Sequence, residues 1–418
     1  MQECSQYSLR PDSEVPQNEV YQQHEHKDDQ ENGRLFVEYG WTALNHVGEE
    51  LCGDNVEYHL DNEWTTLVLA DGLGSGVKAN ILSTLTSKIL CTMVSNDIPM
   101  EECVETIIDT LPVCKVRGVA YSTFSVIHIN QHGDGYLFEF DNPQAICFHD
   151  GHCVDLPRQL IKYEGKDIYK SDLHLVKNDM LLVMSDGTIH AGIGQMLNFG
   201  WERPEIIDHL NTVVQPHMSA RCVAAMLAAA CNDLYLSKPG DDTTVAAIKL
   251  RESLHVNLMV GPPVDKDKDD FYVERFLNTT GKKVVCGGTS SQIVARYLNK
   301  PLRTSYDFPD RDVPPIGFIE GIDLVTEGVI TLRRLLELCE KYVSTTDLSS
   351  KNFTKKDGAS LLANVLFEEA TSIDFFVGQN VNKAHQGLPI DITMKMKLVE
   401  HLAANLKKLG KIVTVNYD

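Results

Sequence analysis

Aspartate residues beside glycine or a second aspartate border several apolar runs of this sequence. Asp71 opens the segment DGLGSG after the run TTLVLA, and Asp186 opens DGT after MLLVMS. Asp241 and Asp242 precede the run TTVAAIKL, and Asp54 lies in the turn-rich segment CGDN. The ends of strands can converge at one edge of a sheet, and several carboxylates stay ionised in a small volume only if cations neutralise them. Oxygen ligands of this kind select Mg²⁺ or Mn²⁺, so the pattern predicts a divalent metal site.

Each Asp-Gly pair taken alone is also typical of a hairpin turn or a helix cap. The context of Asp71 is more informative, because its glycine-rich segment leads directly into a long stretch with helical periodicity at 77–94. The apolar residues of that stretch are expected to form one face that packs on a sheet; they are Ile81, Leu82, Leu85, Ile89 and Leu90.

Short runs rich in β-branched and aromatic residues dominate the chain from Leu35 to Arg251 and predict strands. These runs cover 36–44, 65–70, 121–129, 135–140, 145–149, 180–185 and 243–250. Helical periodicity is found at 77–94, 101–111, 204–214 and 220–236. Clusters of strands with helices on their outer faces predict an α+β fold, a four-layer αββα sandwich of two antiparallel sheets.

Strands and helices alternate after about Ser253. Strands are predicted at 256–260, 283–286, 322–326, 373–377 and 411–417, and helices at 269–278, 290–299, 329–343, 356–369 and 391–409. Such alternation is typical of a mostly parallel sheet with flanking helices. The sequence therefore predicts two domains, 34–252 and 253–418, with a boundary at 251–255.

The chain has 418 residues and a net charge of −21, which is unevenly distributed. Residues 1–252 carry 38 acidic and 17 basic side chains, whereas 253–418 carry 21 of each. An acidic surface repels phosphate backbones, so a nucleic-acid partner is not expected. Residues 1–33 are acidic and lack apolar periodicity, which predicts a flexible tail. The longest apolar run is shorter than a membrane span, and no signal pattern or C-x-x-C pair is found, so we expect a cytoplasmic protein that does not enter membranes.

Four motifs, in this order, resemble those of the metal-dependent PPM-type (type 2C-like) serine/threonine protein phosphatases. They are CGDN at 52–55, ADGLGSG at 70–76, MSDGTIHAG at 184–192 and GDDTTVAAI at 240–248. The branch they resemble is that of the bacterial stage II sporulation protein E phosphatase, over about residues 35–251.

The resemblance implies a role for each matching residue in holding two Mn²⁺ or Mg²⁺ ions. Asp71 would bridge the ions, the carbonyl of Gly72 and the carboxylate of Asp54 would contact one of them, and Asp186 and Asp241 would hold the other. A water shared by the ions would attack phosphorus, so Asp71, Asp186 and Asp241 are the expected catalytic set. Asp242 is a secondary candidate, because neighbouring residues of an extended chain point to opposite sides.

Two features of the wider family are missing here. Many relatives outside this branch carry a His after the bridging Asp-Gly, where this chain has Leu73-Gly74-Ser75, and the arginine near the first motif has no match around 51–55. The donor of a proton to the leaving group is therefore unassigned. Strand or turn histidines such as His128, His149 and His152 are more commonly structural than catalytic.

The second domain shows no family motif. Its segment Gly287-Gly288-Thr289-Ser290, between a strand and a helix, is a candidate anion site, because backbone N–H groups at a helix N-terminus attract anions. A tight turn with a structural cap explains the same residues equally well. The segment is not a P-loop, because no Gly-Lys-Ser/Thr follows.

Together these features predict a protein serine/threonine phosphatase regulated by a C-terminal α/β domain that binds a small molecule or docks a partner. The resemblance implies a phosphoprotein substrate, such as an anti-sigma-factor antagonist or similar switch protein, and regulation through the helix at 77–94. Two alternatives stay open: a non-catalytic adaptor with a phosphatase-like fold, and a small-molecule sensor whose C-terminal domain is the main functional unit. The sequence does not determine the oligomeric state.

Overall fold

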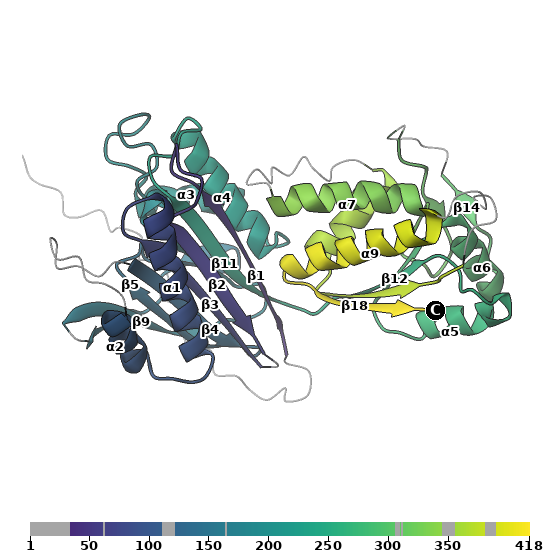
Figure 1. The fold of residues 1–418 in the computed structure, drawn as a ribbon, viewed down its shortest axis with the longest axis horizontal. Coiled ribbons are helices and arrows are strands. Elements are labelled where there is room, and N and C mark those ends of the chain that lie inside the picture. The colour runs from purple at the N-terminus through teal and green to yellow at the C-terminus, as the bar shows by residue number, and fades with distance from the viewer. Residues whose placement is uncertain are drawn as a thin grey trace, which may run out of the picture.

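The computed structural model describes residues 34–61, 63–110, 122–163, 165–305, 310, 312–344, 356–380 and 390–418. The predicted tail at 1–33 lies outside the described residues. Figure 1 shows two lobes side by side, with the N-terminal part of the chain in one and the C-terminal part in the other. No helix in the described ranges is long and apolar enough to cross a membrane.

The first lobe is built on two antiparallel sheets. One has the strand order β1 (Phe36–Leu44), β11 (Thr243–Arg251), β10 (Met180–Met184), β6 (Ile146–His149) and β7 (His152–Val154). The other has the order β2 (Asp54–Leu60), β3 (Trp64–Gly72), β4 (Ser122–Asn130), β5 (Asp134–Phe140), β9 (Lys166–His174) and β8 (Gln159–Tyr163). The strands β2, β7, β8 and β9 were not predicted. Their sequences are more polar and more exposed than those of the central strands, so they lack a long apolar run.

Three apolar layers hold this lobe together. Between the sheets, side chains such as Leu67 and Ile127 from one sheet pack with Leu181 and Ile248 from the other, and all four are fully buried. Helices α3 (Arg203–Val213) and α4 (Ala220–Leu234) cover the outer face of the first sheet, and α1 (Gly76–Val94) and α2 (Met100–Thr110) cover the second. The predicted four-layer αββα sandwich is therefore confirmed.

The apolar face predicted for α1 is wrong for two of its five members. Ile81 and Leu85 are 52% and 43% exposed, and small or polar residues such as Ala79 and Ser83 face the sheet instead. The cause is a close approach of backbones. A Cβ on Gly72 of β3 would lie 2.1 Å from the carbonyl oxygen of Ala79, so α1 rests directly on the strand and large side chains do not fit beneath it.

The second lobe is a mixed sheet in the order β14 (Arg303–Thr304), β15 (Gly317–Phe318), β16 (Leu324–Thr326), β13 (Lys282–Cys286), β12 (His255–Val260), β17 (Ser372–Val377) and β18 (Ile412–Tyr417). The last five of these are parallel, as predicted, and the short strands β14 and β15 add an antiparallel edge. Helices α5 (Asp269–Leu277) and α6 (Gly288–Leu298), preceded by the short turn η2 (Lys266–Lys268), pack on one face. The other face is covered by α7 (Val329–Ser344), α8 (Gly358–Ala363) with its π-helical continuation η3 (Asn364–Glu369), and α9 (Ile390–Lys408).

The two lobes meet through β1, α4 and β11. Arg221 of α4 donates hydrogen bonds to the carbonyls of Tyr342 and Val343 at the end of α7. Arg251 of β11 donates to two carbonyls at the end of η3, and Lys411 before β18 donates to Glu38 of β1. Among the described residues, no hydrogen bond links α1 to the second lobe, so the contact lies away from the helix through which regulation was expected.

Candidate metal centre

Strands β2 and β3 place two of the predicted carboxylates directly opposite each other. Asp54, the first residue of β2, pairs in register with Asp71 near the end of β3. The sequence indicated a turn around Asp54, but the structure has it inside a strand. Because Asp54 and Asp71 are directly opposite each other in the β2–β3 ladder, their side chains lie on the same face of the sheet.

The other sheet brings the remaining carboxylates to the same edge. Asp186 opens the 3₁₀ turn η1 (Asp186–Thr188) after β10, and Asp241 precedes the adjacent strand β11. A hydrogen bond of 2.7 Å from Ser185 Oγ to Asp54 Oδ2 joins the edges of the two sheets. Since both sheets end here, the fold brings together the four carboxylates that the sequence singled out.

The electrostatics of Asp71 and Asp54 reflect this crowding. Burial and neighbouring carboxylates raise the pKa of Asp71 to about 10, and those carboxylates belong to Asp54, Asp186 and Asp241. Burial also raises the pKa of Asp54 to about 7. Without bound cations, ionising the whole cluster is therefore unfavourable.

A histidine completes the cluster. The Nδ1 atom of His190 lies 3.8 Å from Asp186 Oδ2 and 3.9 Å from Asp241 Oδ2, and potential ligand atoms of the three residues all lie within 4.8 Å of one another. Their side chains are about two-fifths exposed, so the cluster is open to solvent. Sequence reasoning missed His190, although its spacing of four residues after Asp186 within MSDGTIHAG was a usable signal.

Asp242 has a different role from its neighbour. Its side chain is buried, and its Oδ1 accepts a hydrogen bond of 2.9 Å from the backbone N–H of His46. Its Oδ2 lies 2.6 Å from the position that a Cβ on Gly53 would take, so a glycine is needed there. Asp242 thus fastens the segment before β2 to β11 through Oδ1, whereas its Oδ2 is buried without a hydrogen-bond partner, so Asp242 stays a secondary candidate ligand.

The donor set fits hard divalent cations. Asp54 Oδ1 is buried and has no hydrogen-bond partner, so it is an acceptor that remains to be satisfied. The carboxylates of Asp71, Asp186 and Asp241 add oxygen donors within the same small volume. Carboxylate oxygens suit Mg²⁺ or Mn²⁺ better than ions that need thiolates.

The other histidines considered in the sequence lie outside the cluster. His128 is buried, bonds Thr66 Oγ1 at 2.9 Å and stacks on Trp64. His149 bonds the buried carboxylate of Asp179, and His152 is exposed on β7. None of these contacts involves the cluster.

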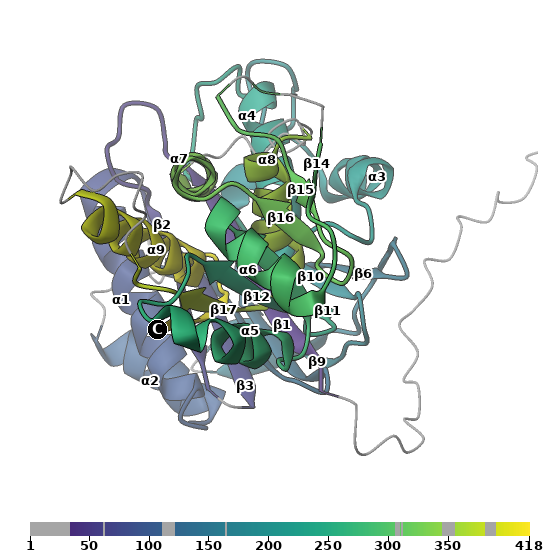
Figure 2. The ribbon, with the colours of Figure 1, turned by 90° about the vertical axis from the view of Figure 1, so that its right-hand side faces the viewer.

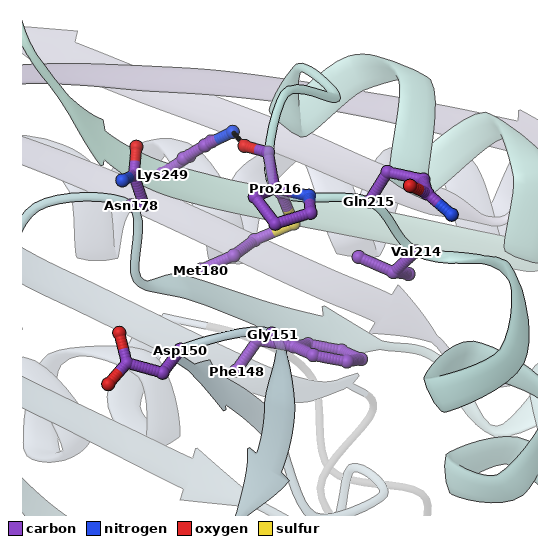
Figure 3. A pocket seen from close by; sticks show the side chains of 9 residues that line it. All are labelled: Phe148, Asp150, Gly151, Asn178, Met180, Val214, Gln215, Pro216 and Lys249. Carbon is purple, nitrogen blue, oxygen red and sulfur yellow. Dashed lines mark hydrogen bonds between the residues drawn. The ribbon is translucent and has the colours of Figure 1, made fainter.

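A cavity of about 150 Å³ lies elsewhere in the first lobe, between β10, β11 and the loop that follows α3 (Figure 3). Its one lysine, Lys249, donates hydrogen bonds to the carbonyls of Pro216 and Met218. None of the clustered carboxylates lines this cavity, so it is separate from the candidate metal centre.

An αββα sandwich with a carboxylate cluster at the common edge of its sheets defines the class of metal-dependent PPM-type phosphatase folds. Residues 61–251 match the family model described as stage II sporulation protein E (SpoIIE). This match agrees with the motifs, which predicted a stage II sporulation protein E-like region over about residues 35–251. The motif at 52–55 lies before the matched range. No curated protein matches the chain in sequence.

Solved structures of the same class are similar to this chain at low identity. One is the structure of the phosphatase domain and a regulatory-domain fragment of SpoIIE from Bacillus subtilis. It has 17% sequence identity over 53% of this chain, with a TM-score of 0.46. The match spans 65% of the SpoIIE chain, which is less than two thirds of its length. The RsbU and RsbW domains of a Mycobacterium tuberculosis protein have 14% identity over 59% of this chain and 71% of theirs, with a TM-score of 0.43. RsbX in complex with magnesium has 21% identity over 53% of this chain and 98% of the RsbX chain, with a TM-score of 0.37.

Proposed function

We propose that this protein is a metal-dependent phosphatase that hydrolyses phosphoserine or phosphothreonine in a protein substrate. The observation that carries the proposal is the convergence of Asp54, Asp71, Asp186 and Asp241, from four segments of the chain, on one edge of a PPM-type sandwich. The open position of the cluster supports a substrate as large as a protein, such as a small phosphorylated switch protein of the anti-sigma-factor antagonist kind.

Two divalent ions, Mn²⁺ or Mg²⁺, would be held by the four carboxylates and the backbone carbonyl of Gly72. When bound, such ions lower the pKa of water and neutralise the charge of phosphoryl oxygens. The surrounding residues hold the ligands in place. Ser185 donates to Asp54, and the hydroxyl of Tyr235 donates to the carbonyl of Gly187 at 2.7 Å, which fixes the turn that carries Asp186. Supporting hydrogen bonds of this type orient metal ligands.

The test is hydrolysis by the purified full-length chain. We expect turnover of an aryl phosphate and of a phosphoserine peptide with Mn²⁺ or Mg²⁺, loss of turnover with EDTA, and recovery when the metal is restored. Turnover that is insensitive to chelation would exclude the metal mechanism. A folded protein that binds Mn²⁺ yet hydrolyses none of several phosphoproteins or aryl phosphates would favour the adaptor alternative.

We propose His190 as the donor of a proton to the leaving group, since it lies beside Asp186 and Asp241 at the open side of the cluster. His190→Gln should slow hydrolysis of a phosphoserine peptide by about 10²-fold, a typical contribution of general acid catalysis. An aryl phosphate has a better leaving group and should lose less than about tenfold. The measurement is kcat/KM for both substrates, with His152→Gln on exposed β7 as the control. Equal losses for the two substrates would contradict a proton-donating role.

The regulatory role belongs to residues 253–418, which we propose form a domain separate from 34–252. Its contacts with β1, α4 and β11 support this role, because β1 and β11 belong to the sheet that has Asp241 at its edge and α4 packs on the same sheet. A cavity of about 370 Å³ at the junction is lined by residues from both lobes, including Trp41, Arg221 and Lys408. A change in this junction would act on the centre through β11.

A further inference from the structure

The parallel strands of the second lobe follow a doubly wound order. Across the sheet they run β16, β13, β12, β17 and β18. The first of them in the chain, β12, is therefore central, and later strands are added first on its β13 side and then on its β17 side. Helices α5 and α6 cover one face and α7 to α9 the other (Figure 2). In such sheets, ligands bind at the carboxyl ends of the strands near the point of reversal.

Backbone contacts already close part of this carboxyl edge. The loops after β12 and β17 touch, because a Cβ on Gly378 would lie 2.1 Å from the carbonyl oxygen of Pro262. Lys395 of α9 is buried here, and its ammonium group donates to the carbonyl of Gly378 beside Gly261. Lys395 therefore helps to close the edge at β12 and β17, and the next strand, β13, offers the more open turn.

The turn after β13 has backbone donors and no acid of its own. Gly287 precedes α6 with a φ of 128°, no side chain caps the helix, and its first turn contains no acidic residue. Gly288 and Thr289 are exposed. The neighbouring helix α7 differs, since its Ile330 N–H donates to the carboxylate of Glu327 at 3.2 Å. The N–H groups that begin α6 are thus available to an external acceptor.

A second feature points to a missing acceptor at the same place. Ser290 is 1% exposed, its Oγ has no hydrogen-bond partner, and this atom lies 3.5 Å from the position that a Cβ on Gly287 would take. The hydroxyl of Thr331, in the first turn of α7, is likewise buried without a partner. The two turns are in contact, since a Cβ on Gly328 would lie 3.4 Å from the Cα of Gly287. Buried hydroxyls are rarely left unbonded, so Ser290 beside the glycine turn offers a donor to a group that binds there.

We propose that the β13–α6 turn binds the phosphate group of a nucleotide-like small molecule. The N–H groups of Gly288 and Thr289 and the hydroxyl of Ser290 would donate to the phosphate oxygens. The doubly wound sheet favours a nucleoside phosphate over a free anion. This site is independent of the phosphatase chemistry proposed for the first lobe, and a ligand here would be an input signal.

The test is isothermal titration of the full-length protein in EDTA, so that the first lobe holds no metal to which phosphate could bind. The probes are ADP, inorganic pyrophosphate, inorganic phosphate and adenosine. We expect one site that binds ADP, with adenosine at least about tenfold weaker because it lacks the charged group. Pyrophosphate that binds as tightly as ADP would support the phosphate contact and overturn the nucleoside part. Binding of no phosphate compound would overturn the proposal, whatever the result of the hydrolysis assay.

Thr289→Glu locates the site, because the exposed position tolerates the change. A carboxylate in the first turn of a helix is stabilising, so the variant should melt no lower than the native protein, yet it should weaken ADP binding at least about tenfold by charge repulsion. Thr289→Gln has the same size without the charge and should bind within about threefold of native. Ser290→Ala should weaken binding by about three- to tenfold, the loss of one hydrogen bond to a charged group. ADP affinity equal in Thr289→Glu and native protein would place the ligand elsewhere.

Discussion

The Asp71→Asn variant is expected to lose hydrolysis by roughly 10³-fold or more, the loss of several kcal/mol of transition-state stabilisation from a bridging metal ligand. Asp71 lies at the centre of the cluster, opposite Asp54 in the β2–β3 ladder and within the fields of Asp186 and Asp241. Because Asp71 is the residue expected to contact both ions, this substitution should have a large effect on metal binding.

The same variant should be more stable than the native protein when metal is absent. Because the pKa of Asp71 is raised to about 10, the folded state holds its proton while the unfolded state ionises near 3.8. The folded state therefore binds more protons than the unfolded state, and the free energy of unfolding falls as pH rises from about 4 towards 10. Asp54, whose pKa is raised to about 7, makes this fall steeper between about pH 4 and pH 7. Asparagine removes one ionisable group, so the fall with pH should become shallower.

The measurement is the melting temperature in EDTA and in saturating Mn²⁺, from pH 5 to pH 9. In EDTA at pH 8, Asp71→Asn should raise the free energy of unfolding by at least about 1 kcal/mol, which raises the melting temperature by about 2–4 °C for a domain of this size. In Mn²⁺ the order should reverse, because only the native protein retains the full ligand set. Asp167→Asn on the exposed surface of β9 is the matched control and should change neither activity nor melting temperature. Full activity in Asp71→Asn would defeat the proposed centre.

The sequence predicted the central elements of both lobes, because each is a buried apolar run bounded by turn residues. Strands such as β3, β10 and β11 are buried along nearly their whole length and carry the aspartates at their ends. Edge strands such as β8 lie largely exposed and show only a weak alternation of apolar and polar residues, so their sequences look like those of loops. The candidate ligands Asp71, Asp186 and Asp241 could be predicted because they adjoin the most apolar segments of the chain.

Two properties of the site depend on tertiary contacts that local patterns do not encode. Asp54 belongs to a strand only because it pairs with β3, and His190 reaches the cluster only because η1 turns the chain after β10. The inward face of α1 likewise depends on how closely Gly72 approaches the helix rather than on hydrophobic periodicity. In each case the decisive neighbour comes from another element.

The junction between the lobes contains a buried charge network whose loss should be costly. Glu38 of β1 is 4% exposed and accepts hydrogen bonds from Arg251 at 3.1 Å, from Lys411 at 3.3 Å and from the N–H of Ala220 at 3.2 Å. Lys411 is itself 5% exposed, and burial lowers its pKa. One carboxylate therefore compensates two cations that join β1 to β11 and to the start of β18.

Glu38→Gln should destabilise the protein by about 3–5 kcal/mol, the usual result of removing one partner from a buried ion pair. Glutamine keeps the size of the side chain but removes the charge that pairs with half-buried Arg251 and buried Lys411. The loss should be greater at pH 6 than at pH 9, since a lysine whose pKa is lowered by burial costs stability mainly while it must carry its charge.

Denaturation followed by tryptophan fluorescence measures this effect in the first lobe, because Trp41, Trp64 and Trp201 all precede residue 252. The matched control is Glu252→Gln, whose carboxylate is 71% exposed and pairs with Lys177. That variant should lose no more than about 1 kcal/mol, as exposed pairs contribute little. If Glu38→Gln lost no more than this control, the network would not hold the lobes together, and coupling between the second lobe and the metal centre through β11 would lose its physical basis.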